Sequence, residues 1–106
     1  MHAALAAGHP VDVDVSGIAA DSLGARRIGT IAYHVAVRTG VCSVLVTDED
    51  LITARWLLWD QHRLVVEHGT AAALAALLSG AYRPAIGERI AILLCGANTN
   101  PSDLTV

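Results

Sequence analysis

Two short runs of strand-forming residues, separated by two stretches with helical spacing, constrain the fold of this chain most strongly. Residues 42–46 and 90–95 are rich in valine, isoleucine and leucine, a composition typical of strands buried inside a sheet. A strand, two helices and a second strand form a crossover connection, which joins parallel strands with right-handed geometry. The sequence therefore predicts an α/β fold that contains part of a parallel sheet.

Helical spacing and capping residues predict the elements around these two strands. Glycines are expected to end four of the helices, at Gly8, Gly24, Gly40 and Gly80. Residues 69–79 are apolar nearly all the way round, so this helix is expected to be buried on most sides. The expected helices cover residues 2–7, 18–23, 28–38, 48–62 and 69–79, and the expected extended segments cover residues 11–15 and 64–66.

Thr47 marks the start of one of these helices. Its side-chain oxygen can accept a hydrogen bond from the backbone N–H near Asp50, and the three acidic residues that follow it suit the positive end of a helix. Helical spacing then predicts one apolar face, with Ile52 and Trp59 beside it. The residues on this face are Leu51, Ala54 and Leu58.

The chain is expected to be a single incomplete domain over residues 1–106. Alanine dominates its 54% hydrophobic residues and phenylalanine is absent, so the core is small. Against an ordering cost of about 1.5 kcal/mol per residue, a chain of this size has little stability to spare. Two buried strands also do not make a stable open sheet. We therefore expect a missing segment or a partner surface, and association that increases with concentration.

Charge and hydropathy exclude several classes of partner. The net charge is −3, all seven cations are arginine, and they form no basic block, which disfavours nucleic acid. The longest apolar run, residues 71–78, is far shorter than the roughly 18 residues that span a membrane. The amino terminus lacks the basic region of a signal peptide. The sequence thus predicts a cytoplasmic protein whose two cysteines, Cys42 and Cys95, are reduced and buried.

Two segments fit the rule that ligands bind where parallel strands end. Residues 95–98 follow the second expected strand, where a glycine allows the backbone to approach a ligand closely. Residues 67–70 place a carboxylate just before a helix whose free N–H groups can hold a polar group. Simpler accounts stay open, because Cys95 can be an inert buried thiol and Glu67 can merely favour the positive helix end.

Metal and dinucleotide sites receive little support from the sequence. His62 and His68 have no neighbouring histidine, cysteine or carboxylate that completes a recognised ligand spacing. No G-x-G-x-x-G motif follows either expected strand, so a small nucleotide-binding protein is set aside.

Four segments in order resemble the serine/threonine dehydratases. Residues 64–80 read L-V-V-E-H-G-T-A-A-A-L-A-A-L-L-S-G, where that family has V-E-P-A-G-A-A-A-L-A-A. Residues 90–98 read I-A-I-L-L-C-G-A-N and are similar to the family's strand that ends in S-G-G-N or C-G-G. Residues 20–24 and 44–51 look like its A-D-G-L-A and V-x-V-x-D-E-E-I stretches. The resemblance covers about residues 2–103.

This resemblance implies a pyridoxal-phosphate enzyme of the tryptophan-synthase-β fold type. The chain would be the carboxyl-terminal portion of the large domain, a partial three-layer sandwich with a parallel sheet. Cys95 would face the pyridine nitrogen of the cofactor, and a neutral thiol there favours β-elimination of water. Glu67 would lie near the ring and the substrate. The implied cofactor-binding residues are Cys95, Glu67, Gly96, Gly69, Asn98, Ser22, Leu23 and Gly24.

The departures from the family pattern limit what this chain is expected to do. His68, Gly69 and Thr70 replace the family's proline, alanine and glycine, and Ala97 replaces a second glycine. The sequence contains no lysine, and the family's Schiff-base lysine, its phosphate-binding loop and its cation-site carboxylate would precede residue 1. No residue of this chain is therefore expected to be catalytic.

The function implied is that of a segment of a serine/threonine ammonia-lyase. Such an enzyme converts a hydroxy amino acid to a 2-oxo acid and ammonia, and this chain alone is expected to be inactive. Its expected partners are a missing amino-terminal portion or further copies in a homo-oligomer. The alternative is a non-catalytic interaction module, or a remnant, that docks on another subunit. A lysine motif encoded directly upstream would favour the enzyme over the remnant.

Overall fold

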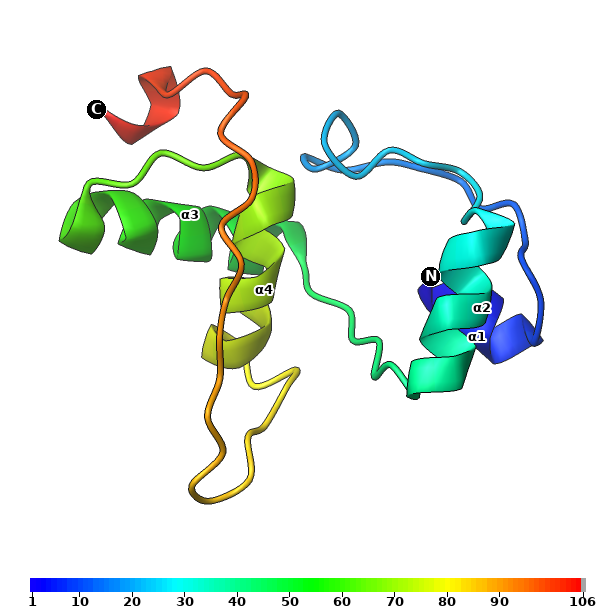
Figure 1. Cartoon of the computed structure of the whole chain (residues 1–106). Coiled ribbons are helices and arrows are strands. Elements are labelled where there is room, and N and C mark those ends of the chain that lie inside the picture. Colours follow the sequence, from blue (N-terminus) through cyan, green and yellow to red (C-terminus); the bar gives the residue numbers. More distant parts are fainter. Residues whose placement is uncertain (106) are drawn as a thin grey trace. The chain divides into compact units, whose positions relative to one another are not determined.

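The computed structural model describes residues 1–105, which belong to two compact units, Met1–Leu45 and Val46–Val106 (Figure 1). Both units are helical, and no strand occurs within residues 1–105. None of the helices in this described part is long and apolar enough to cross a membrane. The elements are α1 (His2–Ala7), α2 (Thr30–Thr39), α3 (Asp48–His62), α4 (His68–Leu78) and a 3₁₀ turn, η1 (Ser102–Leu104).

Glycines close both helices of the unit Met1–Leu45, as the sequence predicts. Gly8 ends α1 with a φ of 78°, and Gly40 ends α2 with a φ of 67°; only glycine adopts these values without strain. The two helices contact each other, and Ala4, Tyr33 and Ala36 are buried. These small and aromatic side chains make a modest core for this unit.

The helix expected at residues 18–23 is wrong, because the chain forms turns there. The Leu23 N–H donates to the Ala19 carbonyl at 2.7 Å, over the span of one helical turn. The bonds beside it span only three residues, from the Ala20 N–H to the Gly17 carbonyl at 3.3 Å and from the Ser22 N–H to the Ala19 carbonyl at 3.1 Å, as in turns. The Val13 N–H donates to the Arg26 carbonyl at 2.8 Å, which closes these turns into a loop.

In the unit Val46–Val106, α3 begins with the capping arrangement predicted from Thr47. The Asp50 N–H donates to Thr47 Oγ1 at 3.2 Å, and the Thr47 N–H donates to Asp50 Oδ2 at 3.0 Å. This reciprocal pair satisfies two backbone donors that a helix start leaves open. Arg63 ends the helix with a φ of 56°, and its guanidinium lies 5.4 Å from the centre of the Trp59 ring.

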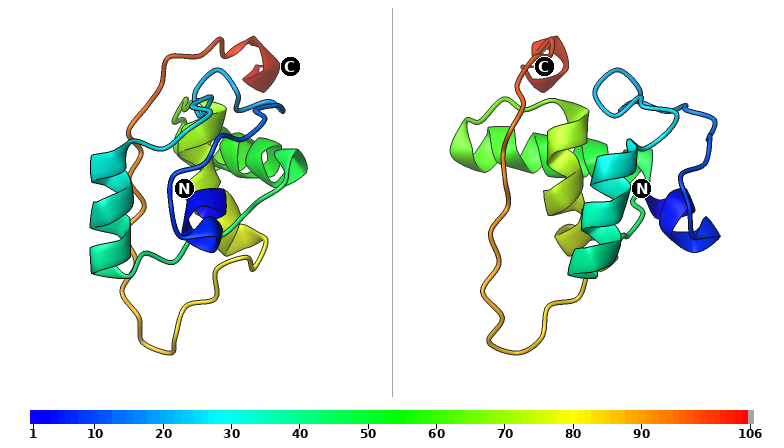
Figure 2. Two further views of the ribbon diagram at one scale, coloured as in Figure 1. Left: turned by 90° about the vertical axis from the view of Figure 1, so that its right-hand side faces the viewer. Right: turned by 45° about the vertical axis from the view of Figure 1, so that its right-hand side comes forward.

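Helix α4 crosses α3, and their contact forms the core of this unit (Figures 1 and 2). The predicted apolar face of α3 is confirmed, because Leu51, Ala54 and Leu58 are all buried. The expectation that residues 69–79 are buried on most sides is met in part. Four of these eleven residues are buried and four are half-buried, whereas Ala73, Leu78 and Ser79 are exposed. The buried residues of α4 are Thr70, Ala71, Ala75 and Ala76.

The two runs predicted to be buried strands form no strand and contain no buried residue. Leu45 is 67% exposed and Leu93 is 78% exposed, and both Cys42 and Cys95 are exposed as well. The predicted burial of these runs and thiols is therefore wrong. A strand of a parallel sheet is buried by neighbouring strands at its edges and by helices on both faces, and residues 1–105 form no such sheet. The parallel sheet, the three-layer sandwich and the single domain over 1–106 stay predictions.

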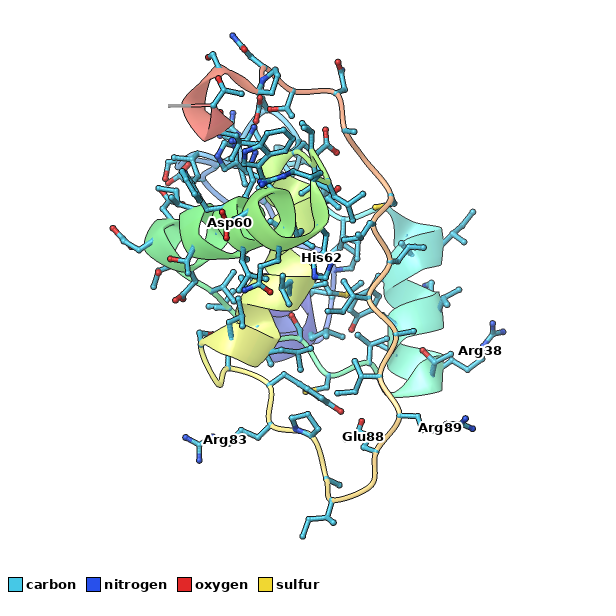
Figure 3. The ribbon with its side chains drawn as sticks, turned by 90° about the vertical axis from the view of Figure 1, so that its left-hand side faces the viewer. Arg38, Asp60, His62, Arg83, Glu88 and Arg89 are labelled. Atoms are coloured by element: carbon cyan, nitrogen blue, oxygen red, sulfur yellow. The ribbon has the colours of Figure 1, made fainter. Side chains whose placement is uncertain are left out.

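A polar loop joins α4 to the extended run at 90–95, and Glu88 organises it. The Tyr82 hydroxyl donates to Glu88 Oε1 at 2.5 Å, and the Ala85 N–H donates to Oε2 at 2.7 Å. Both bonds lower the pKa of Glu88 below its ordinary 4.5, and the bond from Tyr82 has the larger effect. Arg83 and Arg89 extend outward from the same loop (Figure 3).

Replacing Tyr82 by phenylalanine is expected to raise the pKa of Glu88 toward 4.5. A lowered pKa means that these bonds favour the ionised carboxylate of Glu88 in the folded loop. Their contribution to the stability of the folded chain is therefore present above pH 4.5 and is lost as the pH falls through the pKa of Glu88 in the folded state. Carboxyl ¹³C NMR titration measures the change. Arg83→Gln, on the same loop but outside both bonds, should leave the Glu88 titration as it is. An identical curve for Tyr82→Phe would contradict the assignment.

Candidate functional site

Glu67 and Gly96 are in direct contact, although they lie far apart in the sequence. The Glu67 N–H donates to the Gly96 carbonyl at 3.1 Å. A Cβ atom added to Gly96 would lie 2.7 Å from Glu67 Cδ, and nearer still to Oε1. The carboxylate therefore packs against the open side of Gly96, in a place that only glycine leaves free.

Thr70 joins this contact from the first turn of α4. Its Oγ1 lies 3.9 Å from Cys95 Sγ, within hydrogen-bonding distance for sulfur, and a Cβ on Gly96 would lie 3.0 Å from it. Thr70 is 5% exposed, whereas Cys95 is exposed and free. Glu67, Thr70, Cys95 and Gly96 thus form one group, called here the thiol cluster.

Sequence reasoning did not single out Thr70 as a site residue. The signal was present, because Thr70 stands where the related pattern has glycine. The hydroxyl that replaces this glycine lies 3.9 Å from Cys95 Sγ. Thr70 is therefore the residue of α4 that contacts Cys95.

The carboxylate of Glu67 does not serve as the cap of α4. Glu67 occupies the N-cap position, yet no side-chain capping bond forms there in the described chain. The N–H groups of Thr70 and Ala71 donate instead to its backbone carbonyl, at 3.1 and 3.2 Å. The positive end of α4 still favours the carboxylate. Helix capping alone therefore does not account for the side chain, which is directed at Gly96.

Gly69 and Asn98 lie next to the thiol cluster in the chain. Gly69 is the second residue of α4 and is half-buried. Asn98 is exposed and lies in the turn closed by the Thr99 N–H on the Ala97 carbonyl at 2.9 Å. A hollow of about 230 Å³ opens beside Cys95, lined by residues 64–66 and 94–97.

Ser22, Leu23 and Gly24 share a second hollow, in the unit Met1–Leu45. They line about 330 Å³ together with Met1, Ala25 and Ile28. A Cβ on Gly24 would lie 3.2 Å from the carbonyl carbon of Ala20 and clash with its oxygen, so the loop needs glycine here. These three residues and the thiol cluster belong to different units, and their meeting around one cofactor stays a prediction.

Comparison with known proteins identifies the family. The sequence profile described as "Pyridoxal-phosphate dependent enzyme" matches residues 1–96. Phenylserine dehydratase of Ralstonia pickettii is 37% identical over 100 residues, which cover 94% of this chain and 31% of that protein.

Two further relatives lead to the same family. The biosynthetic L-threonine dehydratase of Salmonella typhimurium is 35% identical over 102 residues, which cover 94% of this chain and 20% of that protein. A serine dehydratase-like protein of Mus musculus is 31% identical over 106 residues, which cover 92% and 32% of the two chains. The chain thus spans about a fifth to a third of the length of these curated relatives. Because the family profile matches most of its length, the chain belongs to the pyridoxal-phosphate-dependent enzymes, and its resemblance to the serine and threonine dehydratases is confirmed.

Proposed function

We propose that this chain forms one wall of the cofactor pocket of a pyridoxal-phosphate-dependent serine/threonine ammonia-lyase. It would correspond to the carboxyl-terminal part of the large domain, with its exposed runs 42–46 and 90–95 paired in the parallel sheet of the whole enzyme. The substrate would be a hydroxy amino acid, as the names of the relatives suggest. The observation that carries the proposal is the thiol cluster, in which an accessible thiol, a glycine and a carboxylate meet.

The residues of the thiol cluster fit the edge of a pyridoxal ring. The Cys95 thiol is exposed and can donate a weak hydrogen bond to a ring nitrogen. Gly96 carries no side chain, so its backbone can approach a flat ring closely. When bound, pyridoxal phosphate supplies an electron sink for the substrate's α-carbon. In this proposal Cys95 leaves the ring nitrogen unprotonated, which moderates that sink and favours loss of water from the β-carbon.

The remaining site residues would shape the pocket around the ring. The Glu67 carboxylate would lie beside the ring and the substrate, fixed in place by its contact with Gly96. Thr70 would orient the Cys95 thiol through their 3.9 Å contact. Gly69 and Asn98 would border the same pocket. The hollow that holds Ser22, Leu23 and Gly24 would approach the cofactor from the other side.

A chimeric enzyme tests the proposal. Replacing the matching segment of the Ralstonia phenylserine dehydratase with residues 1–106 is expected to give a protein that binds pyridoxal phosphate and releases 2-oxo acid. The purified 106-residue chain is expected to release none, because it has no lysine with which to hold the cofactor covalently. Absorbance of the bound cofactor and a coupled assay for 2-oxo acid measure the two properties.

Cys95→Ser in the chimera is the matched control, because a hydroxyl keeps a donor at the same place. It is expected to keep turnover, whereas Cys95→Asp should lower it by offering a charge to the ring nitrogen. A chimera that folds but does not bind the cofactor would refute the proposal. That outcome would favour a non-catalytic module that docks through its exposed apolar residues, among them Leu45 and Leu93.

A further inference from the structure

Arg55 is the most deeply buried charged residue in the described chain, and the proposed function assigns it no role. It lies on α3 and is 1% exposed. A buried charge is costly unless hydrogen bonds and an opposite charge surround it. The partners of Arg55 therefore show which parts of the unit it holds together.

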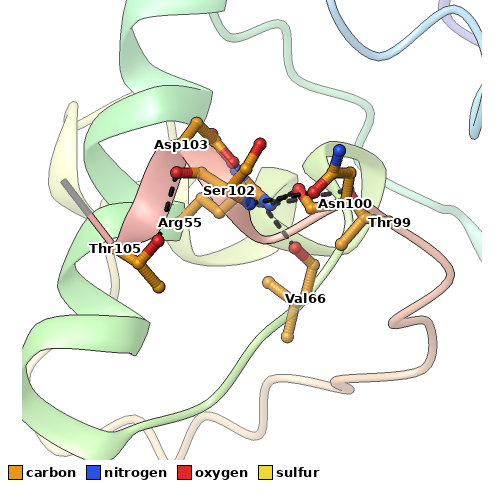
Figure 4. A network of polar contacts seen from close by, with 7 residues as sticks. All are labelled: Arg55, Val66, Thr99, Asn100, Ser102, Asp103 and Thr105. Carbon is orange, nitrogen blue, oxygen red and sulfur yellow. Dashed lines mark hydrogen bonds and ion pairs between the residues drawn. The ribbon is translucent and has the colours of Figure 1, made fainter.

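One side of the guanidinium holds the chain that leads into Glu67. Arg55 Nε donates to the Val66 carbonyl at 2.7 Å (Figure 4). Val66 is itself buried and directly precedes Glu67. Arg55 thus fixes the backbone one residue before the carboxylate of the thiol cluster.

The other side of the guanidinium holds the chain that follows Gly96. Arg55 Nη2 donates to the Asn100 carbonyl at 3.1 Å and to Thr99 Oγ1 at 3.4 Å, and Nη1 pairs with Asp103 Oδ2 (Figure 4). These partners begin three residues after Gly96. A planar group with several fixed donors can hold these two segments of the chain at a set separation, which a lysine ammonium cannot do.

We propose that Arg55 is a positioning residue for the cofactor pocket. It acts as a clamp that holds Val66 and the 99–103 segment together, and so keeps Glu67 in register with Gly96. The bond from the Glu67 N–H to the Gly96 carbonyl, 3.1 Å long, is the link that this clamp protects. The role of Arg55 toward a cofactor rests on the proposed function. Its effect on the contact between Glu67 and Gly96 can be measured in the free chain.

Hydrogen exchange in the 106-residue chain tests the clamp. Arg55→Met is expected to speed exchange of the Glu67 amide by about tenfold or more, because loss of a charged donor frees both chains. The Ala75 amide, inside α4, should change by less than about twofold. Arg55→Lys should behave like Arg55→Met, because lysine keeps the charge but lacks the planar guanidinium whose several donors contact both segments at once. Arg89→Met, which removes an exposed arginine of the 80–89 loop, is the matched control and should leave Glu67 exchange unchanged.

Two outcomes would overturn the proposal. One is equal acceleration of the Glu67 and Ala75 amides, which would mean that Arg55 only stabilises the unit. The other is unchanged exchange at Glu67. If circular dichroism shows that Arg55→Met does not fold, the double variant Thr99→Val, Asp103→Asn replaces it. That variant keeps the bond to Val66, and it should still speed exchange at Glu67; failure to do so also overturns the proposal.

The chimeric enzyme links the clamp to the pocket. There, Arg55→Met is expected to raise the dissociation constant for pyridoxal phosphate by about tenfold, with a larger change in KM than in kcat. An unchanged dissociation constant and an unchanged KM would overturn the positioning role. An unsubstituted chimera that binds no cofactor would instead count against the proposed function, while the exchange result stands separately.

Discussion

Gly96→Ala in the chimeric dehydratase is expected to lower kcat/KM by about 10- to 100-fold. The added Cβ would lie 2.7 Å from Glu67 Cδ and 3.0 Å from Thr70 Oγ1, so both side chains must move. The Glu67 carboxylate ends a flexible side chain and can swing aside at a small cost in stability, so the expected loss is one of transition-state stabilisation, in which about 1.4 kcal/mol is a factor of ten. The carboxylate and the residue that contacts the thiol would be displaced together. Steady-state kinetics with a hydroxy amino acid measure the loss.

Gly29→Ala is the matched control for this prediction. Gly29 has a φ of −66°, and a Cβ there meets nothing within 4 Å, so alanine fits without strain. Its kcat/KM should stay within about twofold of the unsubstituted chimera. Equal activities for Gly96→Ala and Gly29→Ala would show that the close approach at Gly96 does not matter for turnover.

Local rules predicted the helices well, because their ends depend on neighbouring residues. The capping pair of Thr47 and Asp50 and the closing glycines Gly8 and Gly40 are all confirmed. Each involves contacts over three to five residues, which a reader of the sequence can follow directly. Within residues 1–105, four of the five predicted helices form, and their ends lie within two residues of the predicted positions.

The strands could not be judged by the same rules. Residues 42–46 and 90–95 have the composition of buried strands, but burial depends on other strands that residues 1–105 do not provide. The composition of a segment indicates that it can pack inside a sheet, but not that a sheet is present. Leu45 and Leu93 are exposed in residues 1–105 because no neighbouring strands cover them there. The predicted sheet therefore has to be tested in an assembly such as the chimera.

The site was predicted in part. The resemblance suggested that Glu67 and the Cys95–Gly96 pair are neighbours, and the structure brings them together. Their roles toward a cofactor stay predictions. Arg55 was missed because its hydrogen-bond partners lie 11 to 48 residues away, so no local spacing reveals them. The one available sign was that the residues a helical turn away from it are all apolar, namely Leu51, Ile52, Leu58 and Trp59.

Leu58→Ala is expected to lower the free energy of unfolding of this chain by about 2–5 kcal/mol. Leu58 is 6% exposed and lies on the face of α3 that meets α4, so a smaller side chain leaves a cavity at the crossing. The neighbouring residues of α4 are mostly alanines, which are too short to fill it. Urea denaturation followed by the fluorescence of Trp56 and Trp59 measures the change.

Ile52→Ala on the same helix separates cavity formation from a general loss of apolar area. Ile52 is 48% exposed, so its truncation removes little buried surface and should cost less than about 1 kcal/mol. Typical domains are stable by only about 5–15 kcal/mol, so Leu58→Ala consumes a large share of that margin. The thiol cluster depends on α4, and α4 is held by this crossing. We therefore expect Leu58→Ala, but not Ile52→Ala, also to speed exchange at Glu67. Equal urea midpoints for the two variants would show that the α3–α4 crossing does not carry the stability of this unit.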